Sequence, residues 1–539
     1  PGAEPGALQF LRRRAAGPWN LSARLVVTGR PRPGDSAIVR FDVDDSGDER
    51  ELRLDGSALR LLETHAGRTA EAASTGLRLR PGEHAMLVKR RSHGVRVLVD
   101  QRAVLEYPCG LPGKPERAGS RDAAYGLAIA DLRLQPVGPV EFRDDFARQP
   151  GEAGPWSVRQ GQWGVASQSL PGFSSNPFCL RGSGRPATAL CGQWIWEDYR
   201  VSTALCLSAA TDAAGVVAYA DATGRAVLLR GTARRLTVSV IGAGRERVLA
   251  EHEGGLQVGQ WHELALVTRR NLVAAFVDTT PLFTVAVDGL EHGQAGLWAD
   301  SAAGVLFDDV RVEGGSRLAA VPFTARPPQI GEVFAADRHM AAWTALSGTS
   351  SGRPAVDDTL HLAPVGWRVA GGAWFLQSRW QCQPRWTWFG GQGRRLVAVW
   401  HKAQFGGDVS ATAFVAFRMD DPFDPNYRHV GDVCLTVCGD GQDLASGYTF
   451  AFAADRNRVS RLYRLGQVVA ETREGLLPDN RNAFPYREVH LPWMAVRLAR
   501  DGRRIVAEVD GRVLLRYEDA EPLPGRRVAF WSWDNDILL

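Results

Sequence analysis

The stretch Trp156-Ser-Val-Arg-Gln-Gly-Gln-Trp163 occurs a second time in the chain, as Trp367-Arg-Val-Ala-Gly-Gly-Ala-Trp374, so both copies read W-x-V-x-x-G-x-W. A second pattern follows about a hundred residues later, in which a Trp precedes a Val-Asp pair by 17 residues, at positions 261 and 278 and at 493 and 510. A repeat of this length indicates a tandem array of one fold. We therefore expect the chain to contain several copies of one domain.

A weaker third copy lies near the start of the chain, with His84-Ala-Met-Leu-Val-Lys followed by Val99-Asp100. It lacks the W-x-V-x-x-G-x-W opening, which indicates a shorter module. The repeats, together with Gly- and Pro-rich segments at 136–139 and 314–328, predict three modules. We place them at residues 17–137 (module one), 140–314 (module two) and 331–539 (module three).

Strand patterns dominate all three modules. Segments such as 235–241 (Arg-Leu-Thr-Val-Ser-Val-Ile) alternate apolar and polar residues, and Gly, Asp or Pro interrupts them roughly every 8–12 residues. Helical periodicity is almost absent. The sequence therefore predicts an all-β protein of three tandem antiparallel β-sandwich domains. The repeated Trp residues are expected to pack between the two sheets of each sandwich, and the Val-Asp pairs are expected to form tight hairpin turns.

The composition excludes several classes of protein. The 539 residues include 45% hydrophobic residues, which is typical of folded domains, and 64 basic against 60 acidic residues give a net charge of +4. This balance gives no electrostatic footprint for nucleic acid. No run of 18 apolar residues is present, so we expect no membrane span. The chain begins at Pro1, which indicates either a removed signal segment or a fragment.

Four segments of module two carry a family resemblance. They are Asp144-Asp145-Phe146, Trp196-Glu-Asp-Tyr-Arg-Val-Ser-Thr-Ala-Leu205, Gly296-Leu-Trp298 and Phe307-Asp-Asp-Val-Arg-Val312. Together they resemble the concanavalin A-like lectin/glucanase jelly roll, in the laminin G-like form common in bacterial envelope proteins. The resemblance implies a concave sheet that presents aromatic and polar side chains to sugar. It also implies an exported bacterial protein (periplasmic, cell-surface or extracellular) whose partner is a glycan or an envelope protein.

Module three holds ten of the 17 Trp residues, and five of them fall within the 27 residues from Trp374 to Trp400. Trp386 and Trp388 alternate, so they share one face of a strand, and Trp380 and Arg385 lie close by in the sequence. One interpretation is a ligand-binding platform on which sugar rings stack. The alternative is ordinary core packing with Arg side chains over aromatic rings. The sequence leaves both open.

The glucanases of this superfamily carry E-x-D-x-x-E on one strand, and this chain contains no such hexapeptide. The nearest match, Glu508-Val-Asp510-Gly-Arg-Val513, lacks the third carboxylate. We therefore favour a non-catalytic exported protein for glycan binding, adhesion or envelope architecture. Two alternatives stay open: a carbohydrate-active hydrolase whose carboxylates come from separate strands of module three, and a structural accessory subunit of a larger assembly.

Acidic residues flank module two at both ends, at Asp144, Asp145, Asp308 and Asp309. Since members of this family often hold their termini together with calcium, a structural calcium ion is predicted here, with solvated turn residues as the alternative. Loop candidates in module three are Asp420, Asp421 and Asp424, or Asp440 and Asp443. Among the seven Cys residues, Cys179 and Cys191 are candidates for a disulfide across a hairpin, and buried free thiols are the alternative.

Overall fold

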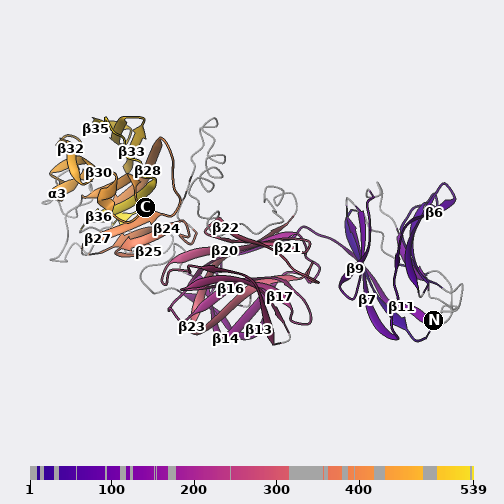
Figure 1. Ribbon diagram of the computed structural model, residues 1–539. Helices are drawn as coiled ribbons and strands as arrows, with labels where there is room; N and C mark the ends of the chain where they lie inside the picture. The colour runs from indigo at the N-terminus through magenta and orange to yellow at the C-terminus, as the bar shows by residue number, and fades with distance from the viewer. Residues whose placement is uncertain are drawn as a thin grey trace. The chain divides into compact units, whose positions relative to one another are not determined.

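The computed structural model describes most of the chain. The described residues are 9–11, 17–29, 36–55, 57–91, 94–109, 117–121, 126–150, 152, 154–167, 178–242, 244–314, 356, 358, 362–378, 387–393, 395–417, 431–477, 494–533 and 537–539. They form two compact units: residues 1–139 with 288–290, and residues 140–287 with 291–539. Figure 1 shows that strands make up nearly all of both units.

Module one is a sandwich of two antiparallel sheets. A six-stranded sheet has the order β1-β10-β3-β4-β5-β6, and a five-stranded sheet has the order β11-β2-β7-β8-β9. The strands are β1 (Gln9–Phe10), β2 (Trp19–Val27), β3 (Ala37–Val43), β4 (Glu49–Leu54), β5 (Ala58–His65), β6 (Arg68–Gly76), β7 (Gly82–Arg91), β8 (Gly94–Val99), β9 (Arg102–Tyr107), β10 (Arg117–Arg121) and β11 (Leu127–Pro136).

Module two is built around one long strand, β23 (Gln294–Gly314), whose first half pairs with β16 and whose second half pairs with β15. The strand therefore passes through both layers, and the main order is β19-β18-β17-β16-β23-β15-β20-β21-β22. The other strands are β12 (Glu141–Asp144), β13 (Ser157–Ser167), β14 (Phe178–Cys191), β15 (Tyr199–Cys206), β16 (Ala213–Ala220), β17 (Ala226–Thr232), β18 (Arg235–Gly242), β19 (Arg245–Glu253), β20 (Trp261–Arg269), β21 (Leu272–Val277) and β22 (Thr280–Ala286).

Module three contains two seven-stranded sheets, with the orders β24-β27-β36-β29-β30-β31-β32 and β25-β26-β37-β28-β33-β34-β35. The elements are β24 (Trp367–Gly371), β25 (Ala373–Ser378), β26 (Thr387–Gln392), β27 (Leu396–His401), β28 (Val409–Phe417), β29 (Val433–Gly439), a 3-10 turn η3 (Leu444–Ser446), β30 (Tyr448–Ala453), a single turn α3 (Ala454–Asn457), β31 (Val459–Arg464), β32 (Gln467–Thr472), β33 (Met494–Asp501), β34 (Arg504–Val509), β35 (Arg512–Glu518), β36 (Arg527–Trp533) and β37 (Ile537–Leu538).

The predicted fold class is confirmed: the chain is all-β and consists of three tandem antiparallel β-sandwiches of the lectin-like jelly-roll type. In the described part of the chain, helix is limited to α3 and η3, and no helix is long and apolar enough to cross a membrane. The predicted module boundaries remain predictions.

The repeated Trp residues have different environments in the fold. Trp374 is fully buried in the core between the sheets of module three, as expected. Trp298 and Trp531 do not lie between sheets, because each belongs to a separate cluster on the opposite face of its sheet. The prediction that all repeated Trp residues join the two sheets was therefore wrong for this pair. Alternate residues of a strand point to opposite faces of the sheet, so the register of the strand decides whether a Trp faces the core or the outside.

The Val-Asp pairs form the expected hairpin turns. The Asp and the next residue both have positive φ, which is the type I′ geometry that matches the twist of a hairpin. The φ pairs are 50° and 67° for Asp100 and Gln101, 46° and 67° for Asp278 and Thr279, and 50° and 76° for Asp510 and Gly511. In each module the Asp carboxylate also accepts a backbone amide from the neighbouring strand, at Ala85, Glu263 and Ala495. This double role explains why the Asp recurs.

Of the two possibilities left open for Cys179 and Cys191, the structure excludes the disulfide. Both residues lie on the single strand β14, at its two ends, so the extended backbone keeps them far apart. The six Cys residues in the described part of the chain are free thiols, and five of them are buried. The alternative, buried free thiols, is therefore the one that holds.

Candidate functional site

The Trp-rich segment predicted to bind ligand lies largely outside the described residues. Trp380, Arg385 and Trp386 fall in this undescribed part of the chain. The backbone of Trp388 lies in β26 and pairs with Gln377, which places it in the sheet that also contains β28 and β33. Ligand binding by these four residues stays a prediction.

The carboxylate of Asp144, a predicted calcium ligand, is occupied by protein donors. Its two oxygens accept hydrogen bonds from Arg148 (Nη1 at 2.6 Å and Nη2 at 3.0 Å), and the Trp156 indole donates to Oδ2 at 2.7 Å. The Phe146 amide also donates to Oδ1. Asp144 is buried, so these contacts fix the corner at the start of module two.

The other three predicted calcium ligands also contact backbone amides. Asp145 accepts the Ala147 amide, Asp308 accepts the amide of Asp309, and Asp309 accepts the Ala363 amide at 2.8 Å. Within the described ranges, no group of three or more His, Cys, Asp or Glu residues is placed to hold a metal. A calcium ion at these residues stays a prediction, and it would compete with the amides and with Arg148.

Among the loop candidates for calcium, Asp420, Asp421 and Asp424 lie outside the described residues. Asp440 accepts the amides of Gln442 and Asp443, and Asp443 accepts the Ala445 amide. Both carboxylates thus stabilise their own turn.

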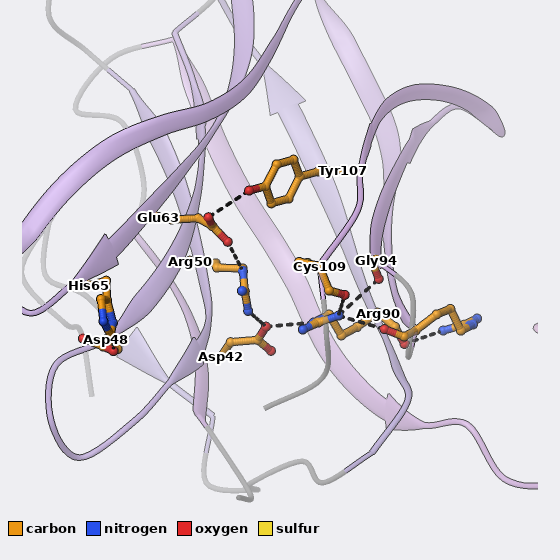
Figure 2. A network of polar contacts seen from close by, with 10 residues as sticks. Asp42, Asp48, Arg50, Glu63, His65, Arg90, Gly94, Tyr107 and Cys109 are labelled. Atoms are coloured by element: carbon orange, nitrogen blue, oxygen red, sulfur yellow. Dashed lines mark hydrogen bonds and ion pairs between the residues drawn. The ribbon is translucent and has the colours of Figure 1, made fainter. Parts of the chain in front are cut away.

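A polar network crosses the interior of module one, as Figure 2 shows. Asp42 accepts hydrogen bonds from Arg50 and from the fully buried Arg90, whose Nε lies 2.8 Å from Oδ2. Arg50 also donates to Glu63, which accepts the Tyr107 hydroxyl at 3.0 Å. The acids and bases of this network satisfy one another across the two sheets. It therefore stabilises the fold.

The outer face of one sheet in module three carries a row of aromatic and charged side chains. Directly paired residues of an antiparallel sheet point to the same face. The register therefore aligns, from β36 to β32, Trp531, Cys434, Ala451, Arg461 and Glu471. The alternate residues, including Leu435, Phe450, Leu462 and Phe530, form the core on the opposite face.

Further aromatic residues extend this row. Trp533 lies two residues after Trp531 on the same strand, so both rings project from the same face, and Trp533 is 51% exposed. Tyr463, on β31, packs from the other side against the small buried residues Cys434 and Ala451. We call the set Trp531, Trp533, Tyr463, Arg461 and Glu471 the Trp531 face. It places aromatic rings on either side of a floor of small side chains.

The polar groups of the Trp531 face are held in place. The Trp531 indole donates to the Thr436 hydroxyl at 3.0 Å, and Thr436 is hydrogen-bonded to Thr449 at 2.8 Å. Arg461 pairs with Glu471 at 3.2 Å. A hydrogen bond with Tyr463, followed by the one with Glu471, raises the pKa of Arg461, so it carries a full charge at neutral pH. Protein partners therefore hold Trp531 and Arg461, and the Arg461–Glu471 pair carries no net charge.

The sequence contained one indication of this face, the repeated Trp531, but it did not show which side of the sheet this residue takes. Trp531 was part of the repeat, but it was expected between the sheets. Tyr463 lies far from Trp531 in the sequence, and only the strand order β36-β29-β30-β31 brings them together. Trp531 and Trp533 have the same i, i+2 spacing as Trp386 and Trp388, which the sequence analysis singled out.

No protein-family model matches the chain, and no curated protein does. Solved structures match parts of it. The carbohydrate binding module CBM66 from Bacillus subtilis is 16% identical with a TM-score of 0.26, and the match covers 30% of this chain and 96% of that one. A protein of unknown function with a galectin-like fold from Bacillus subtilis is 11% identical with a TM-score of 0.27, covering 33% and 96%. Domains LG4-5 of the mouse laminin α1 chain are 11% identical with a TM-score of 0.19, covering 57% and 84%. These low-identity matches say nothing about the ligand of this chain.

Proposed function

We propose that this chain is a non-catalytic glycan-binding protein and that the Trp531 face of module three holds the sugar. The observation that carries the proposal is the placement of Trp531, Trp533 and Tyr463 on one outer face, where Trp533 is half exposed. Exposed aromatic residues gathered on one face mark a binding surface. Flat rings stack on the apolar faces of pyranose sugars.

The charges on this face favour a neutral sugar. The Arg461 guanidinium offers donors to sugar hydroxyls and Glu471 offers acceptors, and their pairing leaves no net charge for an acidic ligand to neutralise. The proposed ligand class is therefore a neutral oligosaccharide or polysaccharide.

Binding is favoured over hydrolysis at this face. Glycoside hydrolysis by the common mechanisms needs two carboxyl groups that flank the bond to be cleaved. The seven strands of this sheet contain a single acidic residue, Glu471, and its carboxylate pairs with Arg461. A hydrolase site on these strands would lack its second group.

An exported location, at the cell surface, in the periplasm or outside the cell, belongs to the same proposal, as does a glycan or envelope partner. A protein that binds polysaccharide is useful where such polymers occur. Fractionation of the source cells with detection by antibody tests the location, and recovery of the protein in the cytoplasmic fraction alone would contradict it.

The binding proposal is tested with the full chain and a panel of neutral oligosaccharides (β-1,3- and β-1,4-glucans, mannans, galactans and fructans) by isothermal titration calorimetry. We expect at least one member to bind, and Trp533→Ala to weaken that binding by about tenfold or more, since aromatic anchors dominate such contacts. Phe414→Ala is the matched control, because Phe414 is 67% exposed but lies on the other sheet of the module. Equal loss in both variants, or no binding by the parent, would refute the proposal.

A further inference from the structure

Module two contains a face equivalent to the Trp531 face. The sheet order β23-β16-β17-β18-β19 in module two matches β36-β29-β30-β31-β32 in module three. The register aligns, from β23 to β19, Trp298, Gly215, Arg230, Thr237 and Glu251. Trp298 thus occupies the position of Trp531, and Arg230 occupies the position of Ala451.

Three of the five aligned positions differ between the two modules, and the difference between Arg230 and Ala451 bears on the exposure of the Trp ring. The Arg230 guanidinium lies over the Trp298 ring, 5.8 Å from its centroid, and Trp298 is only 7% exposed. In module three the small Ala451 leaves Trp531 partly exposed. In module two the ring packs in a cluster that includes Leu190, Val217 and Leu228, and the Arg230 side chain of the same sheet lies over it.

Arg230 is held in this position by a carboxylate. Its two terminal nitrogens lie 3.1 and 3.2 Å from the two oxygens of Glu246, and Glu246 also accepts the Ser239 hydroxyl at 2.7 Å. Both charged side chains are partly exposed, about a quarter for Arg230 and a third for Glu246. Solvent weakens an ion pair of this kind, so Arg230 is free to be displaced by a competitor for the ring.

A second observation points to a ligand at the same place. Thr237, the direct strand partner of Arg230, is 2% exposed, and its hydroxyl oxygen has no hydrogen-bond partner. A buried polar group without a partner is unfavourable, and most such groups in folded proteins are paired. A hydroxyl-bearing ligand that replaced Arg230 over Trp298 would reach this region of the sheet.

We propose that module two contains a second site for a neutral sugar, built on Trp298 and kept closed by the Arg230 side chain. The inference rests on the proposed function of the Trp531 face, because the ligand class is taken from the open site. In the parent protein the second site is the weaker one, since the ligand must displace Arg230 from both Trp298 and Glu246. Removal of the Arg230 side chain opens it.

The test measures stoichiometry by isothermal titration calorimetry, on the full chain, with the oligosaccharide that binds the Trp531 face. The parent protein is expected to show one strong site. Arg230→Ala is expected to show two, with the second site strengthened by about tenfold over the parent. Arg235→Ala is the matched control, because Arg235 pairs with Glu251 on the same sheet but does not cover Trp298.

Two further variants separate this inference from the proposed function. Trp533→Ala alone is expected to weaken the strong site by about tenfold or more, whereas Arg230→Ala combined with Trp533→Ala is expected to retain the second site at its strengthened affinity. Glu246→Gln, which loosens Arg230 without enlarging the face, is expected to strengthen the second site by a smaller factor and covers the case in which Arg230→Ala does not fold. A folded Arg230→Ala protein with one site, or an unchanged second site in Glu246→Gln, would overturn the inference while the Trp531 face still binds.

Discussion

At the scale of single residues, the repeated Asp of the hairpin turns shows how one position serves different partners. In module one, Asp100 accepts His84 Nδ1 at 2.7 Å, and His84 Nε2 lies 2.9 Å from the Arg80 carbonyl oxygen. Both partners are acceptors, so the protonated ring, with a proton on each nitrogen, satisfies both of them. In module two the His262 Nε2 instead accepts the Gln257 amide, and Lys402 supplies the cation to Asp278.

These contacts predict a distinct titration for His84. The hydrogen bond to the Arg80 carbonyl, followed by the one to Asp100, raises the pKa of His84 above its ordinary value of 6.5. A raised folded-state pKa means that the stabilisation is complete below about pH 6.5 and is lost as the pH rises through the folded value. Proton NMR titration should show this, and Asp100→Asn should lower the pKa. His252 is the control, since burial lowers its pKa. A His84 pKa at or below that of His252 would contradict the assignment.

The second turn residue leads to another prediction. Thr279 adopts φ 67° in the type I′ turn of module two, whereas the equivalent residue of module three is Gly511. A β-branched residue in this region is strained, and Gly removes the strain at some entropic cost. Thr279→Gly is therefore expected to stabilise the chain against urea by about 0.5–1 kcal/mol. Gly511→Thr, the reverse change, should destabilise it. The explanation fails if both variants have the stability of the parent.

At the scale of elements, the sequence predicted the strands and turns but not which face each residue takes. Period-two patterns and the Val-Asp turns depend on neighbours in the sequence, so they were readable. The positions of Trp298 and Trp531 depend on strand order and register, which bring together segments far apart in the chain. The choice left open for Cys179 and Cys191 has the same cause, because the sequence did not show that one continuous strand, β14, contains both residues. The proposed Trp531 face lies in the module that the sequence singled out, and ligand binding by Trp386 and Trp388 remains a prediction.

The W-x-V-x-x-G-x-W pattern allows a comparison between two elements. Trp374 is fully buried in the core of module three, whereas Trp163 is half-buried and packs against Phe307 at a centroid distance of 5.6 Å. Trp374→Ala is expected to destabilise module three by about 3–5 kcal/mol, and Trp163→Ala to cost module two less, about 1–3 kcal/mol. Urea unfolding followed by fluorescence measures both. A larger effect at Trp163 than at Trp374 would show that the burial of these rings does not determine how much each contributes to the free energy of unfolding.

At the scale of the whole molecule, contacts join modules two and three, and residues of the repeated motifs take part in them. The second unit includes both modules, and Ala363 and Val365 pack against a cluster of module two residues that contains Trp261. The Val369 amide donates to Gln260, and the Ala363 amide donates to Asp309. Two residues singled out from the sequence for other reasons, Asp278 of the turn and Asp309 of the predicted calcium site, thus contact module three or the segment that leads into it.

Lys402 makes the decisive contact of this junction and leads to the last prediction. Its ammonium group donates to the Trp261 carbonyl at 2.7 Å and to Asp278 at 2.9 Å. Burial raises the pKa of Asp278, but Lys402 and His262 lower it by more, so the pair persists in mild acid and weakens only as the pH falls below about 4.

Lys402→Met leaves Asp278 without its cation, and breaking a largely buried pair is expected to destabilise the junction by about 3 kcal/mol. Scanning calorimetry should then resolve two transitions where the parent unit shows one. Arg512→Met removes an exposed pair with Glu474 and should leave the profile unchanged. If Lys402→Met melts like Arg512→Met, the apolar contacts of the linking segment join the modules. The ion pair then contributes little to the stability of the junction.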